Sequence, residues 1–216
     1  MDLFSVFLKG GVIMWAILVA SIIGVTLVID RYLVLKKAKT NTVTFLIKIK
    51  SLLKKKDVDG AISFCMEERT PAANIIKKGL KKFRFGHSRV REAIEDAGRQ
   101  EITKLERGLS TLATISGVAP MLGFLGTVTG MVTAFATIQD LQGAANPADL
   151  AGGIWEALIT TVFGLIVGII MLTAYNYFIS AIKKLVSEME SLSIEVVDTV
   201  EEINSGKPVT DNFDED

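Results

Sequence analysis

The sequence predicts an all-α membrane protein with three transmembrane helices and long cytoplasmic helical extensions. Three stretches of the 216-residue chain contain no charged residue and no His, namely 10–29, 108–139 and 157–182, with lengths of 20, 32 and 26 residues. An α-helix rises about 1.5 Å per residue, so roughly 20 apolar residues cross the hydrocarbon core of a bilayer. The alternative, three buried helices of a soluble protein, is disfavoured because soluble chains seldom run so far without a charge.

The uncharged stretches and their flanks divide the chain into consecutive segments. These are a short interfacial helix at 1–11, a first transmembrane helix at 12–30, a cytoplasmic helical domain at 31–107, a second transmembrane helix with a cytoplasmic extension at 108–139, a short periplasmic loop at 140–155, a third transmembrane helix at 156–182, a cytoplasmic helix at 183–204 and a disordered acidic tail at 205–216. The first stretch also resembles a cleaved signal peptide, because Lys9 precedes it. Its length and the basic residues that follow favour a retained anchor.

The basic residues predict how the chain is oriented. Of the 24 Lys and Arg residues, 20 lie in 31–107, whereas Asp140 and Asp149 are the charged residues of 140–155. Cytoplasmic segments next to membrane helices carry an excess of Lys and Arg. We therefore expect residues 31–107 and the C-terminus in the cytoplasm. The N-terminus and the short loop then lie on the opposite side of the membrane.

Helix-start signals subdivide the cytoplasmic part. Asp57 is a predicted helix start, and Pro71 suits the first turn of the next helix. Ser88 is the predicted N-cap of a long helix that runs without interruption into the second transmembrane segment. Residues 185–216 hold ten acidic residues and one Lys, whereas 31–107 hold 20 basic and nine acidic residues. These two segments either attract each other or form separate solvated faces.

Residue types that enzymes and metal sites require are sparse. Cys65 is the only cysteine, and the single His87 lacks the neighbouring ligands of a metal site. The glycine-rich segment 123–130 lacks the Lys-Ser/Thr pair of a phosphate-binding loop. We therefore predict no enzyme, no metal and no cofactor. The basic runs at 54–56 and 77–84 are interpreted as orientation signals rather than a nucleic-acid surface, so the expected surroundings are membrane lipid and protein partners.

The second and third uncharged segments are rich in small and hydroxyl residues. Small residues let membrane helices approach closely, and the candidates for helix packing are Pro120, Gly123, Gly126, Gly130, Gly164 and Gly168. Hydroxyl groups in a membrane either line a polar path or bond the carbonyl one turn back. The hydroxyl candidates for an ion pathway are Thr127, Thr129, Thr160 and Thr161.

Ionisable groups are informative by their position and by their absence. Glu156 stands at the predicted outer start of the third span, where it is either a solvated flank or a functional group turned into the helix bundle. It shares one helix face with Thr160. The three uncharged stretches contain no carboxylate, His or Lys. Hydroxyl groups do not titrate near neutral pH, so a proton pathway through this chain would need a carboxylate from another chain.

Two sequence motifs resemble the MotA/TolQ/ExbB proton-channel family. Residues 119–135 read APMLGFLGTVTGMVTAF and resemble the family pattern of Pro, then Gly-Leu-x-Gly-Thr-Val-x-Gly, then an aromatic residue. Residues 152–165 read GGIWEALITTVFGL and resemble Ile-x-Glu-Ala-Leu-x-x-Thr-x-x-Gly-Leu. The resemblance covers 99–174, and it identifies an ExbB/TolQ-like subunit.

The resemblance implies an assembly and a mechanism. It implies a homopentameric ring around single-span partners of the ExbD/TolR type, whose membrane Asp carries the proton. The motion would be passed to an envelope-spanning protein of the TonB or TolA type. Thr127 and Thr161 occupy the positions of the family's two pore-lining threonines, and Glu156 that of its outer glutamate. Thr129 replaces the usual aromatic residue and places the choice between proton and sodium in question.

Alternative functions remain open at this stage. A sodium-driven motor of the same family is one alternative, and a membrane scaffold that does not conduct ions is another. A TonB-type role and a Tol-type role in the envelope are not separated by the sequence.

Overall fold

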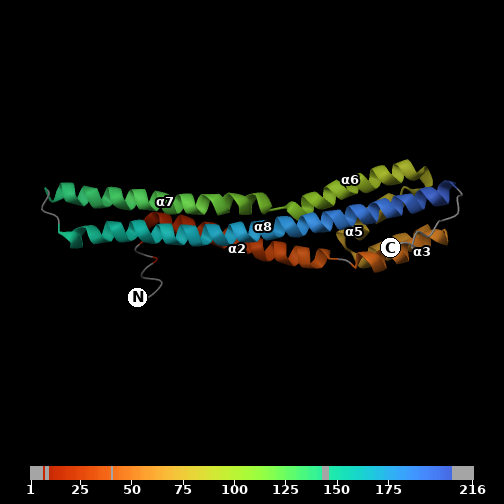
Figure 1. Ribbon diagram of the computed structural model, residues 1–216, viewed down its shortest axis with the longest axis horizontal. Coiled ribbons are helices and arrows are strands. Elements are labelled where there is room, and N and C mark those ends of the chain that lie inside the picture. The colour runs from red at the N-terminus through yellow and green to blue at the C-terminus, as the bar shows by residue number, and fades with distance from the viewer. Residues whose placement is uncertain (1–6, 8–9, 40, 143–145, 206–216) are drawn as a thin grey trace, which may run out of the picture. The chain divides into compact units, whose positions relative to one another are not determined.

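The computed structural model describes residues 7, 10–39, 41–142 and 146–205, and their regular structure is entirely helical (Figure 1). Three helical stretches, within 11–38, 87–140 and 150–204, are long and apolar enough to cross a membrane. The prediction of an all-α chain with three candidate membrane spans is therefore confirmed. The predicted interfacial helix at 1–11 and the predicted tail at 205–216 lie almost entirely outside the described residues.

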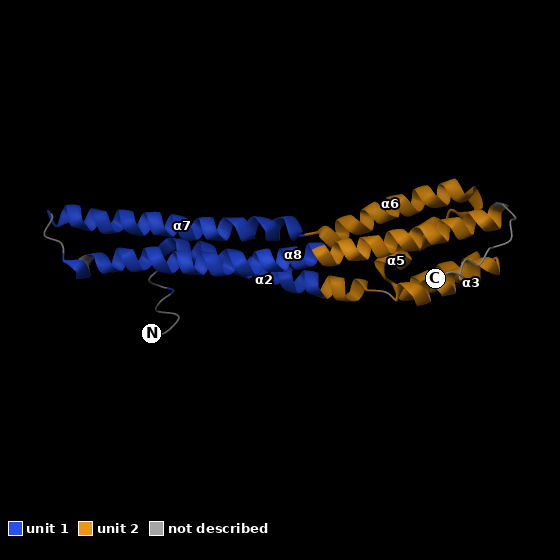
Figure 2. Cartoon of the chain, viewed as in Figure 1, with its two compact units in different colours: residues 1–32, 108–179 blue, residues 33–107, 180–216 orange. Residues whose placement is uncertain are grey.

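The chain divides into two compact units, which Figure 2 shows in different colours. Unit 1 comprises residues 1–32 and 108–179, and unit 2 comprises residues 33–107 and 180–216. The helices that contribute to unit 1 are α2 (Gly11–Ala38), α7 (Leu109–Asp140) and α8 (Pro147–Ser205). Unit 2 contains the ends of α2 and α8 together with α3 (Thr42–Lys54), α4 (Val58–Glu68), α5 (Pro71–Leu80), the 3-10 helix η1 (Phe83–Phe85) and α6 (His87–Glu106).

Small residues bring the backbones of α7 and α8 together within unit 1. A Cβ atom added to Gly130 would lie 2.6 Å from the carbonyl oxygen of Gly153. One added to Gly164 would lie 2.6 Å from the carbonyl oxygen of Ala119. Because contact positions rise along α8 as they fall along α7, the two helices are antiparallel. Membrane helices pack this closely through van der Waals contact, since lipid provides no hydrophobic drive between them.

Helix α2 packs against α8 in the parallel direction. Gly11 faces Glu156 near the start of both helices, and a Cβ atom added to Gly24 would lie 2.6 Å from the sulfur of Met171. Contact positions therefore rise along both helices. The beginnings of α2 and α8 consequently lie at the same end of unit 1. Many apolar side chains of α2 remain exposed, and Trp15 at 53% exposure is one of them.

The long helix predicted from Ser88 into the second transmembrane segment is two helices instead. Helix α6 begins at His87, directly after Gly86, whose φ of +91° is not helical. The chain then breaks at Gly108, whose φ is +80°, before α7 begins. Both φ values lie in the region that favours glycine, because a Cβ atom is strained there. The predicted Ser88 N-cap and the predicted continuity were therefore wrong.

Helix α8 begins earlier than predicted, inside the segment 140–155 that was expected to be a loop. It begins at Pro147, so residues 147–155 of the segment 140–155 are helical. Proline suits the first helical turn, where its missing N–H is not needed. The helix continues for 59 residues to Ser205. The prediction that the third span continues as a helix beyond residue 182 is confirmed.

The helix starts of unit 2 follow local capping rules. The Asp57 carboxylate accepts a hydrogen bond of 2.8 Å from the Gly60 backbone N–H. The Thr70 hydroxyl accepts one of 3.3 Å from the Ala73 N–H, and Pro71 occupies the first turn of α5. Such side-chain bonds satisfy backbone donors that a helix start leaves unpaired. The two helix starts predicted at Asp57 and Pro71 are confirmed.

Unit 2 has an apolar core of its own. The rings of Phe45 in α3 and Phe64 in α4 stack with centroids 5.5 Å apart. Cys65 is fully buried, and this burial raises the pKa of its thiol to about 12. The thiol therefore stays neutral and packs as a small hydrophobic group. Other fully buried side chains of this unit include Ile49, Leu53, Ile76, Val90, Leu192, Val196 and Val200.

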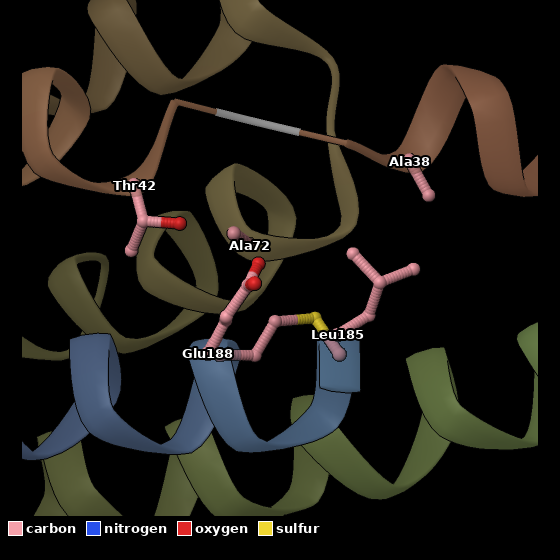
Figure 3. Close-up of a pocket in the computed structure, with 6 residues that line it drawn as sticks. Ala38, Thr42, Ala72, Leu185 and Glu188 are labelled. Carbon is pink, nitrogen blue, oxygen red and sulfur yellow. The ribbon is translucent and has the colours of Figure 1, made fainter. Parts of the chain in front are cut away.

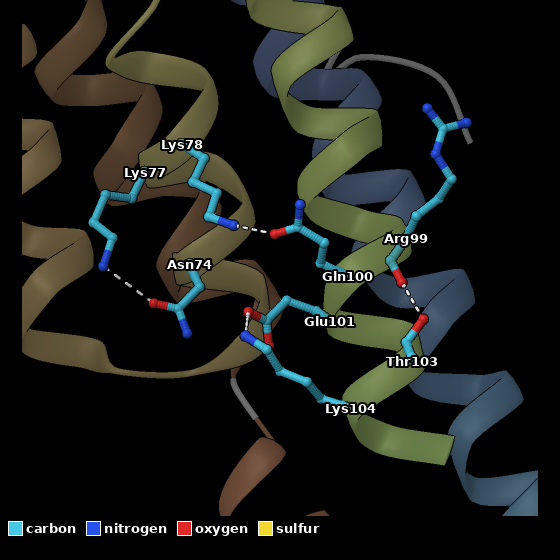
Figure 4. A network of polar contacts seen from close by, with 8 residues as sticks. All are labelled: Asn74, Lys77, Lys78, Arg99, Gln100, Glu101, Thr103 and Lys104. Carbon is cyan, nitrogen blue, oxygen red and sulfur yellow. Dashed lines mark hydrogen bonds and ion pairs between the residues drawn. The ribbon is translucent and has the colours of Figure 1, made fainter. Parts of the chain in front are cut away.

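Polar contacts between helices of unit 2 lie mainly at its surface. The Lys50 ammonium in α3 pairs with the Glu195 carboxylate in α8 at 2.5 Å, which joins the basic and acidic segments at one point. The Lys78 ammonium donates to the Gln100 side-chain oxygen at 2.5 Å across α5 and α6 (Figure 4). Exposed ion pairs contribute little to stability. The packed core therefore holds the helices of this unit together.

A small hollow lies inside unit 2 between α3, α5 and the ends of α2 and α8. It is lined by Ala38, Thr42, Ala72, Leu185, Glu188 and Met189 and has a volume of about 10 Å³. Figure 3 shows the Glu188 carboxylate directed from α8 toward Ala72. A space of this size is at the lower limit for one water molecule. The hollow is therefore too small for an organic substrate.

The backbone contact between α7 and α8 makes a prediction about Gly164. Gly164→Ala is expected to destabilise the protein by about 1–3 kcal/mol, because its methyl group would overlap backbone atoms of Ala119 and Gly123. Gly117→Ala is the matched control in α7, since nothing lies within 4 Å of a Cβ atom added there. Thermal unfolding in detergent measures both variants. Equal stability of the two would contradict the contact.

The core of unit 2 makes a second prediction from two neighbouring residues. Ile49→Ala is expected to cost about 2–5 kcal/mol because it opens a cavity at a fully buried position. Lys50→Ala is expected to cost less than about 1 kcal/mol because its pair with Glu195 is solvent-exposed. Denaturant unfolding of the two variants tests the difference. A larger loss in Lys50→Ala would show that the ion pair outweighs the core.

Candidate functional site

Thr127 of α7 and Thr161 of α8 meet across the interface inside unit 1. Their hydroxyl groups are hydrogen-bonded to each other. The Thr127 hydroxyl also lies 3.2 Å from the Ala157 carbonyl oxygen, and the Thr161 hydroxyl lies 3.0 Å from the Gly123 carbonyl oxygen. Four oxygen atoms from two helices therefore gather at one point. Both threonines are only partly buried within a single chain.

The number of hydrogens limits how this oxygen cluster is bonded. Each threonine hydroxyl has one hydrogen to donate and two lone pairs to accept with. The Thr127 hydroxyl reaches the other hydroxyl and the carbonyls of Gly123 and Ala157, so it has more acceptors than hydrogens. Thr161 reaches the same two carbonyls. The cluster thus permits alternative hydrogen-bond arrangements, and it offers oxygen lone pairs to a proton donor or a cation without carrying a charge.

Glycine makes this meeting of hydroxyls possible. A Cβ atom added to Gly123 would lie 3.1 Å from the Thr161 Cα and 3.0 Å from the Thr160 carbonyl oxygen. One turn further along α7, Gly126 lies against the side chain of Thr160. These two glycines seat the threonines of α8 against α7. A larger residue at either position would separate the helices.

The two other predicted hydroxyl groups, those of Thr160 and Thr129, differ in their relation to the pair. Thr160 is fully buried and donates to its own helix, at 2.9 Å to the Glu156 carbonyl and 3.0 Å to the Ala157 carbonyl. Thr129 is exposed on α7 and donates to the carbonyls of Leu125 and Gly126, each at 3.1 Å. Both hydroxyls therefore bond carbonyls of their own helix. Thr160 therefore shares the Ala157 carbonyl with Thr127 and Thr161, whereas Thr129 bonds carbonyls elsewhere on α7.

The predicted packing residues lie along the α7–α8 interface, where Pro120 has a distinct place. Its ring lies against Gly168, and the Ser116 carbonyl would lie 3.1 Å from a Cβ atom added to Gly168. Proline has no N–H, so the Ser116 carbonyl loses its usual partner four residues on. The absence of a side chain at Gly168 leaves room for both groups. Gly164 and Gly168 thus follow Thr160 along one packed face of α8.

Glu156 lies at the other end of the helix pair from this proline. It is partly buried, and its carboxylate lies against Gly11 at the start of α2. Five residues separate it from Thr161, which corresponds to about 7.5 Å along α8. Its carboxylate is therefore not part of the hydroxyl cluster in one copy of the chain. Among the described residues, no group of three or more His, Cys, Asp or Glu side chains is placed to hold a metal ion.

Comparison with known proteins assigns the family. The sequence pattern of the MotA/TolQ/ExbB proton channel family matches residues 67–191, which is more than half of the chain. The chain belongs to the MotA/TolQ/ExbB proton channel family. The match includes Thr127, Glu156 and Thr161, and it confirms the resemblance drawn from the two motifs. Membership together with three long apolar helices makes the chain a multi-pass membrane protein.

Proteins that are similar to this chain carry ExbB and TolQ names. The chain is 33% identical over 187 residues to an ExbB homolog of Methanothermobacter thermautotrophicus, covering 86% of this chain and 66% of that protein. It is 31% identical over 185 residues to an ExbB-like protein of Synechocystis, covering 81% and 69%. It is 40% identical over 89 residues to the Tol-Pal system protein TolQ of Pseudomonas aeruginosa, covering 41% and 38%. The chain thus spans about two thirds or less of these proteins' lengths.

Two residues of the site were not singled out from the sequence. Ala157 supplies the carbonyl that both paired threonines approach, and a backbone acceptor carries no signal of residue type. Gly11 contacts Glu156, although 145 residues separate them in the chain. Only the parallel packing of α2 on α8 reveals that contact. For the Ala157 carbonyl, the sequence offered one hint, which is the four-residue spacing between Ala157 and Thr161.

The hydroxyl pair makes a prediction about coupling between two positions. Thr127→Val and Thr161→Val are expected to show a coupling energy of roughly 0.5–2 kcal/mol in a double-mutant cycle, because each hydroxyl bonds the other. Thr133→Val is the control partner, since Thr133 is exposed and bonds the Thr129 carbonyl of its own helix. Unfolding of the four variants in detergent gives the cycle. Additive effects of Thr127→Val and Thr161→Val would contradict the cross-helix bond.

Proposed function

We propose that this chain is the ring-forming subunit of an ion-driven motor in the bacterial inner membrane. The observation that carries the proposal is the hydroxyl pair of Thr127 and Thr161, which joins two candidate membrane helices in a member of a proton channel family. Two hydroxyls and two carbonyls form a polar point within the uncharged stretches of α7 and α8. In this role the cluster guides an ion through the membrane.

A second protein supplies the titrating group in this proposal. The uncharged stretches that form the candidate spans contain no carboxylate, His or Lys, and hydroxyl groups do not titrate near neutral pH. A partner of the ExbD/TolR type, with one span and a membrane Asp, fits that requirement. Five copies of the chain around such partners form the ring. The motion of the partners is passed to an envelope-spanning protein of the TonB or TolA type.

The orientation follows from charge. Residues 31–107 hold 20 of the 24 basic residues and lie in the cytoplasm together with the end of α8. The N-terminus and the connection between α7 and α8 lie in the periplasm. The parallel packing of α2 and α8 supports this topology, because it puts the beginnings of both helices at one end of unit 1.

Sodium is the second candidate ion. Thr129 provides a hydroxyl where the family pattern has an aromatic side chain, and it is exposed on α7. Hydroxyl and carbonyl oxygens can replace the hydration shell of an alkali cation. The same groups can also guide a proton. Proton transport is the primary proposal, since a titrating partner would complete it. A membrane scaffold without ion flux is the competing function from a different class.

Ion flux in proteoliposomes tests the proposal. The chain, with and without its single-span partner, is placed under a proton gradient and then under a sodium gradient. Flux is expected only with the partner and only under the gradient of the transported ion. Thr161→Val is expected to lower flux at least tenfold, because it removes one hydroxyl of the pair. Thr173→Val is the matched control on α8, since its exposed hydroxyl bonds the Ile169 carbonyl of the same helix.

The outcomes separate the candidate functions. Flux from the chain alone would contradict the need for a partner's titrating group. Full flux in Thr161→Val would contradict the role of the hydroxyl pair. Thr160→Val tests whether the pathway includes the adjacent, buried hydroxyl. Absence of flux under every gradient, with the partner bound and the load protein present, would favour the scaffold.

A further inference from the structure

Gly11 has an unusual backbone conformation at the start of a long helix. Its φ is +62°, and it is the first residue of α2, a helix of 28 residues. Side chains other than glycine's rarely adopt this conformation, since the Cβ atom then crowds the backbone. Conformation alone therefore favours glycine at this position.

The space around Gly11 is also filled by one identified group. A Cβ atom added to Gly11 would collide with the Oε1 atom of Glu156 and would lie 2.9 Å from its Cδ. The Glu156 carboxylate thus occupies the place that a side chain at residue 11 would take. Gly86 provides the contrast, because its φ is +91° and nothing lies within 4 Å of a Cβ atom added there.

The start of α2 is a favourable place for this carboxylate. The first backbone N–H groups of a helix carry partial positive charge, which attracts carboxylates within about one turn. The first turn of α2 contains no acidic residue of its own. The approach belongs to a continuous interface, since Gly24 of α2 contacts Met171 of α8 further along the same two helices.

We propose that Gly11 is a positioning residue for Glu156. Its missing side chain lets the carboxylate rest on the N-terminal end of α2, which fixes the Glu156 carboxylate near the start of the third candidate span. The contact itself is independent of any function. Its consequence for transport rests on the proposed function and on the family resemblance, which gives Glu156 the position of the outer glutamate of the ion pathway. Any side chain at residue 11 displaces that carboxylate and changes where its charge lies.

Thermal unfolding of the assembled full-length protein in detergent tests the contact. Gly11→Ala is made in the native background and in Glu156→Ala, and Gly86→Ala measures the cost of a positive φ without a neighbour. Gly11→Ala is expected to lower the unfolding midpoint by roughly 2–8 °C in the native background. In Glu156→Ala, the loss is expected to shrink by at least half. Equal losses in both backgrounds would overturn the proposal.

Ion flux with the single-span partner tests the functional consequence. Gly11→Ala is expected to reduce flux at least fivefold while the chain still assembles with its partner. Glu156→Asp in the Gly11→Ala background is expected to restore part of the flux, because the shorter side chain leaves room for the new methyl group. A defect caused by the positive φ of residue 11 alone would not be rescued in this way, so failure of rescue would overturn the positioning role.

Glu156→Gln separates this inference from the proposed function. If Glu156→Gln abolishes flux while Gly11→Ala leaves it unchanged, the positioning role is overturned and the role of Glu156 stands. If Glu156→Gln leaves flux unchanged but unfolding shows the coupling, the contact stands and the acidic role of Glu156 in transport is overturned. Loss of flux in both variants together with rescue by Glu156→Asp supports the proposal in full.

Discussion

The close backbone contact between α7 and α8 is the constraint on which the rest of unit 1 depends. Gly130, Gly126 and Gly123 on α7 face Ala157, Thr160 and Gly164 on α8 at distances that exclude any larger side chain. The register of the two helices follows from this row of small residues. Lipid supplies no hydrophobic drive for helix association, so dispersion contacts and hydrogen bonds between the helices stabilise the pair. Unit 2 relies instead on a core of Ile, Leu and Val side chains.

That register decides which polar groups meet. Because Gly123 removes a side chain from α7, the Thr161 hydroxyl reaches the Gly123 carbonyl at 3.0 Å and also reaches Thr127. An unpaired hydroxyl in an apolar medium is costly, and the shared bonds remove that cost. The cluster is therefore stable in a membrane without any charge. In the proposed function, the group that binds and releases protons approaches the cluster from a partner chain.

The sequence predicted the helical class and the three apolar spans because charge-free length is a signal that needs no tertiary information. It also predicted the helix starts at Asp57 and Pro71, which depend on neighbouring residues alone. It failed at Gly108, where one glycine ends a strongly periodic pattern, and at the start of α8, where Pro147 begins the helix within the predicted loop. Contacts between distant segments, such as Gly11 with Glu156, have no local signal.

Threonine illustrates why the functional site is harder to predict than the fold. Thr129, Thr133 and Thr173 each donate to the carbonyl four residues back, which any helical threonine can do. Local bonding therefore does not distinguish a polar lining from a satisfied side chain. Thr127 and Thr161 differ because they also bond across helices, over separations of 30 to 38 residues. The distinction arises from the α7–α8 register, so substitutions that shift the register should impair this pair before they affect the other threonines.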